Sequence, residues 1–285
     1  MSSSQRPTYA YRPMTAADVA AAHALSVQLK WPHRLEDWAM LQRVSQGFVA
    51  EDHGRLIGTA FTCPQGDYAT IGLVIVSDEY QGQGIGRKLM ELALQACGTQ
   101  TAMLNATLAG APLYASQGFV DFGHIQQHQG NVLPPAPKDL PSGEHCRRLT
   151  KADQTDQIEL ANSGSGLDRR AVLGDLFDCV EEAVGIERDG QLRAFAILRP
   201  FGRGRYIGPV VAENPQQAKH LIAVLLAHVP DAFVRMDVPS DSGLGPWLEE
   251  AGLKQVDTVA QMVRGSPPQA RGGVKQFALV TQAIG

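Results

Sequence analysis

Apolar residues recur along this chain with two spacings, and these spacings predict alternating strands and helices. Residues 71–76 form a nearly continuous apolar run, which is typical of a buried strand. Residues 85–94 instead place apolar side chains at positions 85, 89, 92 and 93, so that they share one face of a helix. The pattern therefore predicts an α/β fold, with a mixed sheet flanked by helices.

The same reasoning predicts the other elements of the first 120 residues. Pro32 interrupts the helical pattern because proline removes a backbone donor, and Gly54 supplies the turn of a β-hairpin. In chain order we expect a strand at 9–12, helices at 15–29 and 35–45, a hairpin at 48–61, a strand at 69–76, a helix at 85–94, a strand at 102–105 and a short helix at 110–118.

A glycine-rich loop joins the buried strand to the amphipathic helix. Its residues are Gln81, Gly82, Gln83, Gly84, Ile85 and Gly86. Glycine lets backbone amides approach a ligand without interference from a Cβ atom, and the amides at a helix start lack partners. The loop therefore predicts a seat for an anion such as pyrophosphate. A flexible turn before a helix is the alternative, whereas a dinucleotide-binding fold would require Gly-x-Gly-x-x-Gly after a first strand.

This loop resembles the signature of the GNAT acyltransferase superfamily, which is Gln or Arg, two residues, Gly, one residue, and Gly or Ala. Gln81, Gly84 and Gly86 occupy these positions. The resemblance implies that the loop holds the pyrophosphate of coenzyme A and that acetyl-CoA is the acyl donor. It also implies that the preceding strand carries a bulge. The cofactor-binding residues implied are Val74, Ile75, Val76, Gln81, Gly82, Gln83, Gly84, Ile85, Gly86, Arg87 and Asn105.

A second GNAT signature lies between residues 105 and 119. Asn105 ends a strand that separates from its neighbour in the family, and Tyr114 stands two residues after Pro112. The resemblance implies that Tyr114 is the general acid that protonates the departing thiolate. Backbone amides near Val74 and Val76 would stabilise the tetrahedral intermediate. A packing role for Tyr114 is the alternative.

The segment between the first two helices lines the acceptor side of the cleft in GNAT folds. Trp31, His33 and Arg34 are therefore candidate substrate contacts. The alternative is that Trp31 and Trp38 pack in the core and that His33 is a solvated loop residue.

The regular pattern is lost between residues 126 and 147, where prolines at 134, 135 and 137 stiffen an extended connector. We therefore expect a catalytic GNAT domain at 1–127, a proline-rich linker at 128–146 and a second domain at 147–285.

The second domain repeats the first in order. Residues 12–18 are echoed at 147–153, and 51–56 and 71–76 recur 136 positions later. These echoes predict two tandem GNAT folds, each a mostly antiparallel twisted sheet flanked by helices. The strand expected at 274–280 could complete either half.

The second copy has lost the functional residues of the first. Its counterpart of the glycine loop is residues 213–218, which contain no glycine and include Glu213, whose carboxylate would repel phosphate. Leu248 stands where the first copy has Tyr114. We expect the second copy to bind no coenzyme A and to shape the acceptor pocket.

Composition narrows the partners. The net charge of −4 is spread over both halves, so nucleic acid is an unfavourable partner, and the mildly acidic surface faintly suits a cationic small molecule. The N-terminus lacks a signal-peptide core and no run approaches 18 apolar residues, which disfavours export and membrane spanning. Four scattered cysteines and separate histidines give no metal site, and they suggest a cytoplasmic protein.

Together these features predict an acyl-CoA-dependent N-acyltransferase that acetylates the amine of a small metabolite, such as an amino acid, polyamine or amino sugar. The amine would attack the thioester directly, because no cysteine beside a histidine suggests an acyl-enzyme. A non-catalytic acyl-CoA sensor and a protein-lysine acetyltransferase are the alternatives. The identity of the acceptor, the general base and the choice between monomer and homodimer stay open.

Overall fold

The structure is a computed structural model that describes residues 8–285. The polar N-terminal lead that argues against a signal peptide lies largely outside these residues. Within the described part of the chain, none of the helices is both long enough and apolar enough to span a bilayer.

The first half contains the expected elements in the expected order. They are β1 (Ala10–Pro13), α1 (Val19–Gln28), α2 (Leu35–Val44), β2 (Gln46–Asp52), β3 (Arg55–Gln65), β4 (Tyr68–Val76), α3 (Ile85–Cys97), β5 (Thr101–Ala106) and α4 (Ala111–Ala115). One further strand, β6 (Val120–Asn131), follows them and was not expected from the sequence.

The second half repeats this order, as the sequence echoes predict. It contains β7 (Glu144–Arg148), α5 (Gln154–Ser165), α6 (Arg170–Leu176), β8 (Glu182–Arg188), β9 (Gln191–Phe201), β10 (Gly204–Ala212), α7 (Pro215–Ala227), β11 (Phe233–Pro239), α8 (Gly245–Glu250), β12 (Lys254–Arg264) and β13 (Lys275–Ala278). We call the two halves the front module and the rear module.

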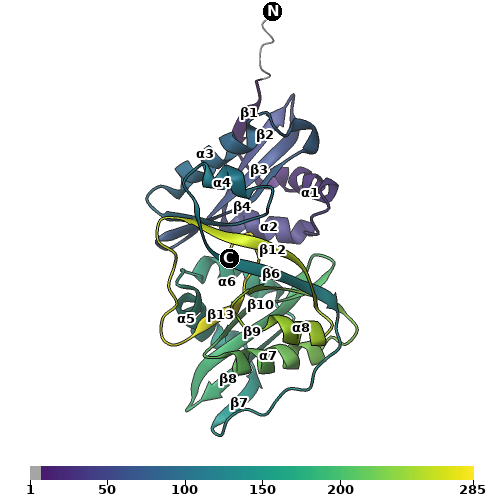
Figure 1. Cartoon of the computed structure of the whole chain (residues 1–285), viewed down its shortest axis with the longest axis vertical. Coiled ribbons are helices and arrows are strands. Elements are labelled where there is room, and N and C mark those ends of the chain that lie inside the picture. Colours follow the sequence, from purple (N-terminus) through teal and green to yellow (C-terminus); the bar gives the residue numbers. More distant parts are fainter. Residues whose placement is uncertain (1–7) are drawn as a thin grey trace, which may run out of the picture.

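The two modules exchange their sixth strands. The strand order is β1-β2-β3-β4-β5-β12-β6-β11-β10-β9-β8-β7, so that β12 of the rear module pairs with β5 and β6 of the front module pairs with β11. β6 and β12 lie side by side in the middle of one continuous sheet (Figure 1). Neither module therefore completes its sheet with its own residues.

Strand β6 corrects one sequence expectation. The sequence pattern predicts no regular element from residue 126 onward, but β6 continues to Asn131 and pairs there with β11 and β12. Its residues 126–131 are polar, and they remain ordered because backbone hydrogen bonds to two neighbouring strands do not depend on apolar side chains. The stretch without helix or strand is 132–143.

One hydrophobic core is shared by the modules. Trp38 on α2 and Phe61 on β3 belong to the same cluster of buried side chains as Val172 and Leu173 on α6 and Val211 on β10. The helices between the first and second strands of each module thus pack together, and burial of this apolar surface holds the modules to each other.

The C-terminal strand joins the rear module. β13 pairs antiparallel with β10, and the amide of Leu279 donates to the carbonyl of Asp237 on β11 at 2.9 Å. After β13 the chain turns toward the front module, so the C-terminus lies in the middle of the molecule (Figure 1). We call residues 281–285 the C-terminal segment.

Candidate active site

The loop between β4 and α3 has the conformation that an anion site requires. Gly82 and Gly84 have φ values of 75° and 86°, in the left-handed region that favours glycine, and a Cβ atom at either position would meet nothing within 4 Å. The first helical hydrogen bond runs from the amide of Lys88 to the carbonyl of Gly84 at 3.0 Å. The amides just before Lys88 therefore remain available to a ligand.

The expected bulge is present in β4. Thr59 pairs with Ile75 and Phe61 with Gly72, so β4 contains one extra residue, and Leu73 adopts a φ of 48°. The hydroxyl of Thr59 donates to the carbonyl of Leu73 at 2.8 Å and fixes this irregularity.

The bulge lies where β4 loses its neighbour. Parallel pairing of β4 with β5 ends at Ile71 and Leu104, and the strands then separate. On the other edge of β4, the amide of Ser77 donates to Ile57 on β3. Because successive strand residues point their amides to opposite sides, the amides of Val74 and Val76 face the gap that β5 leaves.

This gap is part of a cavity of about 570 Å³ that we call the donor cleft. Most of the cofactor residues expected from the sequence line it: Val74, Val76, Gln81, Gly82, Gly84, Ile85, Gly86, Arg87 and Asn105. Two do not. Ile75 is buried in the core. The side-chain amide of Gln83 accepts a hydrogen bond from the hydroxyl of Tyr9 and donates one to the backbone carbonyl of Glu79, outside the cleft.

Tyr114 also lines the donor cleft and is largely buried. Burial raises the pKa of its phenol to about 12, so the hydroxyl stays protonated at neutral pH. Its ring packs on Gly110, where an added Cβ atom would lie 2.8 Å from the ring. Gly110 thus leaves room for the phenol to reach the cleft.

The equivalent positions of the rear module are closed in two ways. At the start of α7, the side chain of Asn214 accepts a hydrogen bond from the amide of Gln217, and the side chain of Gln217 accepts one from the amide of Glu213. These amides are therefore satisfied internally. In addition, β13 occupies the gap between β10 and β11 that corresponds to the open gap of the front module.

A second cavity of about 250 Å³ adjoins the donor cleft, and we call it the acceptor cavity. The two share the residues Trp31, Gly72, Leu73, Asn105 and Thr107. The remainder of the acceptor cavity is lined by Lys30, Pro32, His33, Gln127, Arg235, Asp257, Thr281, Gln282 and Ala283. A molecule in the acceptor cavity can therefore meet one in the donor cleft at the shared wall.

Two of the three expected acceptor contacts lie in this cavity. Trp31 lines both cavities and His33 lines the acceptor cavity. Arg34 does not. Its guanidinium pairs with Asp37 at 2.9 Å and donates to the carbonyl of Pro200 at 3.1 Å, so it joins the modules instead.

His33 is neutral at physiological pH. Burial, and to a smaller extent the nearby guanidinium of Arg235, lower its pKa to about 4. Its ring lies edge-on to Phe201 of the rear module, with 5.6 Å between centroids. His33 is thus a partly buried cavity residue rather than a solvated loop residue.

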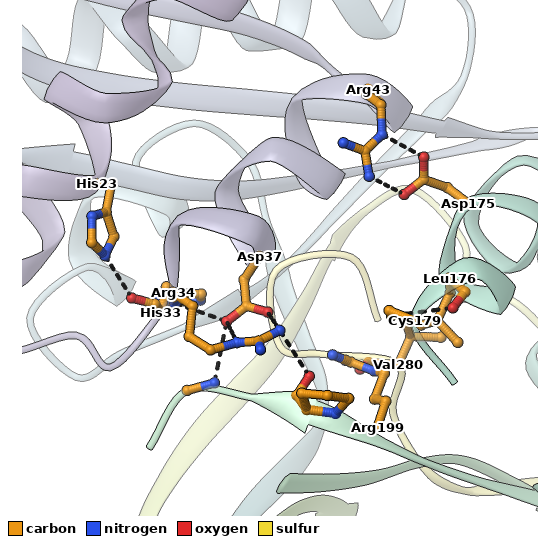
Figure 2. A network of polar contacts seen from close by, with 12 residues as sticks. His23, His33, Arg34, Asp37, Arg43, Asp175, Leu176, Cys179, Arg199 and Val280 are labelled. Atoms are coloured by element: carbon orange, nitrogen blue, oxygen red, sulfur yellow. Dashed lines mark hydrogen bonds and ion pairs between the residues drawn. The ribbon is translucent and has the colours of Figure 1, made fainter. Parts of the chain in front are cut away.

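Polar contacts hold this part of the interface in place (Figure 2). Arg43 on α2 forms two hydrogen bonds with Asp175 on α6, at 2.6 and 2.8 Å, and Asp37 accepts the amide of Gly202 at 3.2 Å. The guanidinium of Arg199 donates to the carbonyl of Val280 at 2.7 Å and so fixes the chain just before the C-terminal segment.

The C-terminal segment and the exchanged strands were missed by the sequence reasoning. Gln282 links the equivalent strands β5 and β11 of the two modules. Its backbone carbonyl accepts a hydrogen bond from the side chain of Asn105 at 2.8 Å, and its side-chain amide donates one to the carboxylate of Asp237 at 3.1 Å. Residues 235–237 of the rear module also repeat residues 103–105 of the front module, so Asp237 is the counterpart of Asn105, and this correspondence was the one available signal. Gln127 on β6 pairs with Asp257 on β12, and no local sequence pattern predicts this pairing.

Comparison with known proteins places both modules in one family. Two family models, each described as an acetyltransferase (GNAT) domain, match residues 43–121 and 158–277. These matches cover most of the front module and most of the rear module.

Several individual proteins are similar over most of the chain. The N-acetyltransferase YitH of Bacillus subtilis, itself uncharacterised, is 28% identical over 223 residues, which cover 77% of this chain and 78% of that protein. Holothin acyltransferase of a Pseudoalteromonas species is 27% identical over 208 residues, covering 71% and 69%. A solved structure of a proposed acetyltransferase from Pyrococcus horikoshii superposes with a TM-score of 0.80 at 19% identity, covering 97% and 96%.

Proposed function

Since this chain belongs to the GNAT acetyltransferase family and is an N-acetyltransferase with two tandem GNAT domains, we propose that it transfers an acetyl group from acetyl-CoA to the amine of a small metabolite. The observation that carries the proposal is the asymmetry between modules. The front module has an open donor cleft with available amides, and the rear module has its counterpart filled by β13.

The residues of the donor cleft fit acetyl-CoA. Available amides at the start of α3 and the left-handed glycines suit a pyrophosphate, and Gln81 holds the loop by donating to the carbonyl of Val76 at 3.2 Å. The gap between β4 and β5 suits an extended pantetheine chain, which can hydrogen-bond to a strand edge. When bound, acetyl-CoA would supply the thioester carbonyl that the amine attacks.

The chain's own residues then have separate tasks. The amides of Val74 and Val76 face the cleft and would donate to an oxygen that becomes negatively charged. Tyr114 would provide a proton from its hydroxyl to the leaving sulfur, which the protonated state of its phenol allows. The shared wall between the cavities would align the amine.

The acceptor cavity favours a small substrate over a protein. It lies between the modules and is lined by residues of both. In this proposal residues 1–127 would carry the chemistry, residues 128–146 would connect the modules, and residues 147–285 would shape the acceptor site. A peptide would need an open groove at this position to present a lysine.

The proposal is tested by following thiol release from acetyl-CoA with a panel of amino acids, polyamines, amino sugars and lysine peptides. We expect release with at least one small amine and none with the peptides. If acetyl-CoA binds but no amine is acetylated, the front module is a sensor and the proposal is wrong. Release only with peptides would instead support a protein acetyltransferase.

A further inference from the structure

Two buried arginines lie close together beside Phe201, and one of them, Arg235, lines the acceptor cavity. Arg199 and Arg235 are 5% and 8% exposed, and their guanidinium carbons lie 4.9 and 5.7 Å from the centre of the same ring, that of Phe201. Arg199 forms no ion pair with any carboxylate of the described residues. Asp237 is the one described carboxylate that pairs with either arginine.

Arg235 has a nitrogen left for a ligand. Its Nε and Nη2 atoms donate to Asp237 at 3.1 and 3.0 Å. Its Nη1 atom donates to no residue of the described chain and is not enclosed, and Arg235 lines the acceptor cavity. A guanidinium has five N–H donors, so the pair on Nη1 can bind an oxyanion while Asp237 holds the rest of the group in place.

Asp237 is held by other hydrogen bonds and does not bind Nη1 of Arg235 in place of a ligand. Its carboxylate accepts hydrogen bonds from Arg235, from the hydroxyl of Tyr206 at 3.0 Å and from the amide of Gln282 at 3.1 Å. These bonds fix the orientation of Arg235 and leave Nη1 as its one guanidinium nitrogen without a partner among the described residues.

The other charged residues of the cavity are exposed. Lys30 and Asp257 both line it but lie at the solvent side, where water and salt weaken their fields. They also have opposite signs. His33 adds no charge because it is neutral, so the buried charges at and beside the cavity are the two arginines and Asp237, which together are net positive although the whole chain is mildly acidic.

We propose that the acceptor amine carries an anionic group, a carboxylate or a phosphate, that binds Nη1 of Arg235. This inference rests on the proposed function and selects among its substrate classes. Arg235 belongs to the acceptor cavity and not to the wall shared with the donor cleft. An anionic group held there leaves the amine of the same small molecule at the shared wall, beside Leu73 and Asn105. Amino acids and phosphorylated amines fit this arrangement, and polyamines do not.

The test compares matched amines that differ in charge. Calorimetry with the full-length protein in the presence of coenzyme A would measure binding of L-phenylalanine against L-phenylalaninamide, L-alanine against L-alaninamide, and phosphoethanolamine against ethanolamine, with spermidine as the cationic probe. We expect the anionic member of at least one pair to bind about tenfold tighter or more. The pair that discriminates tells a carboxylate from a phosphate.

A variant locates the effect. Arg235→Lys keeps the charge beside Asp237 but removes the second donor group, so the preference for the anionic member should fall about tenfold. Arg203→Lys is the matched control, because Arg203 is exposed and stacks on Phe233 away from both cavities. If Arg235→Lys does not fold, the affinities of the wild-type protein for the matched anionic and neutral amines test the inference without the variant.

The inference is overturned if no pair discriminates, if the neutral amines or spermidine bind more tightly, if no probe binds, or if Arg235→Lys retains the full preference. Failure of the proposed function gives a different result. In that case an amine binds, with or without charge preference, and thiol release from acetyl-CoA is absent.

Discussion

Individual residues of both modules place hydrogen-bond donors at the two cavities. The available amides around Gly84, the phenol of Tyr114 and the unpartnered Nη1 of Arg235 each present donors to a cavity. Neighbouring residues hold these groups in place: Gly110 packs under the ring of Tyr114, and Asp237 binds the guanidinium of Arg235. Substitutions of these residues should therefore separate binding from turnover.

Tyr114→Phe should lower kcat by about 100-fold and leave the affinity for acetyl-CoA nearly unchanged, because it removes the proton donor and keeps the packing. Steady-state kinetics with calorimetry would measure both quantities. Phe119, whose ring lies 6.3 Å from that of Tyr114, offers a control as Phe119→Leu, since it contacts Tyr114 without lining the cleft. Unchanged turnover in Tyr114→Phe would exclude Tyr114 as the acid.

His33 predicts a pH dependence of stability. The pKa of its imidazole is about 4 in the folded chain, whereas its ordinary value is 6.5, so the unfolded chain binds more protons between these two pH values. The contribution of neutral His33 to the free energy of unfolding is complete above pH 6.5 and is lost as the pH falls toward 4. Urea unfolding at pH 7 and pH 4.5 should therefore show that the free energy of unfolding falls less between these two pH values for His33→Gln than for the wild type. Equal losses would show that the burial of His33 does not shift its protonation.

At the scale of elements, one segment serves both modules. β13 fills the gap between β10 and β11, and the C-terminal segment then reaches the end of the corresponding gap in the front module. Arg169, which is 2% exposed, anchors it by donating to the carbonyl of Ile284 at 2.8 Å. Gln282 and Ala283 of this segment line the acceptor cavity, whereas Ile284 belongs to the shared core.

Gly72→Ala should displace the C-terminal segment. An added Cβ atom would lie 2.3 Å from the carbonyl oxygen of Ala283, and backbone cannot yield as a side chain can. We expect a loss of about 1–3 kcal/mol in the free energy of unfolding and a higher KM for the acceptor. Gly174→Ala in α6 is the matched control, because its Cβ atom would meet nothing within 4 Å. If Gly72→Ala changed neither the free energy of unfolding nor the KM, the C-terminal segment would not be held as described.

The sequence predicted nearly all helices and strands because each has its own local pattern. The helix α3 and the strand β4 follow directly from the spacing of apolar residues. The polar end of β6 was interpreted as linker, since its order depends on pairing with β11 and β12 rather than on buried side chains. The route of the C-terminal segment was equally hidden, because Gln282 is placed by contacts with residues far away in the sequence.

At the scale of the whole molecule, strand exchange makes the modules interdependent. β5 has its outer partner in β12, and the shared core contains Trp38 and Leu173 from opposite modules. The sequence could predict two similar modules from their internal echoes. It could not predict the exchange, because β6 and β12 are equivalent elements and either could complete either sheet.

Residues 1–127 expressed alone should consequently fail to fold cooperatively. The fragment would expose the edge of β5 and the apolar face of α2. Near-ultraviolet circular dichroism and thermal unfolding would measure its tertiary packing, with the full chain as reference. A sharp unfolding transition in the fragment would contradict the interdependence of the modules.

The central claim is that one donor site exists per chain and lies in the front module. Calorimetric titration of the full chain with acetyl-CoA tests it most directly, with Gly84→Glu and, as matched control, Gln216→Glu in the exposed first turn of α7. We predict one site per chain, at least about 100-fold weaker binding in Gly84→Glu because a carboxylate would face the pyrophosphate, and wild-type affinity in Gln216→Glu. Two sites per chain, or tight binding retained by a folded Gly84→Glu protein, would contradict the account.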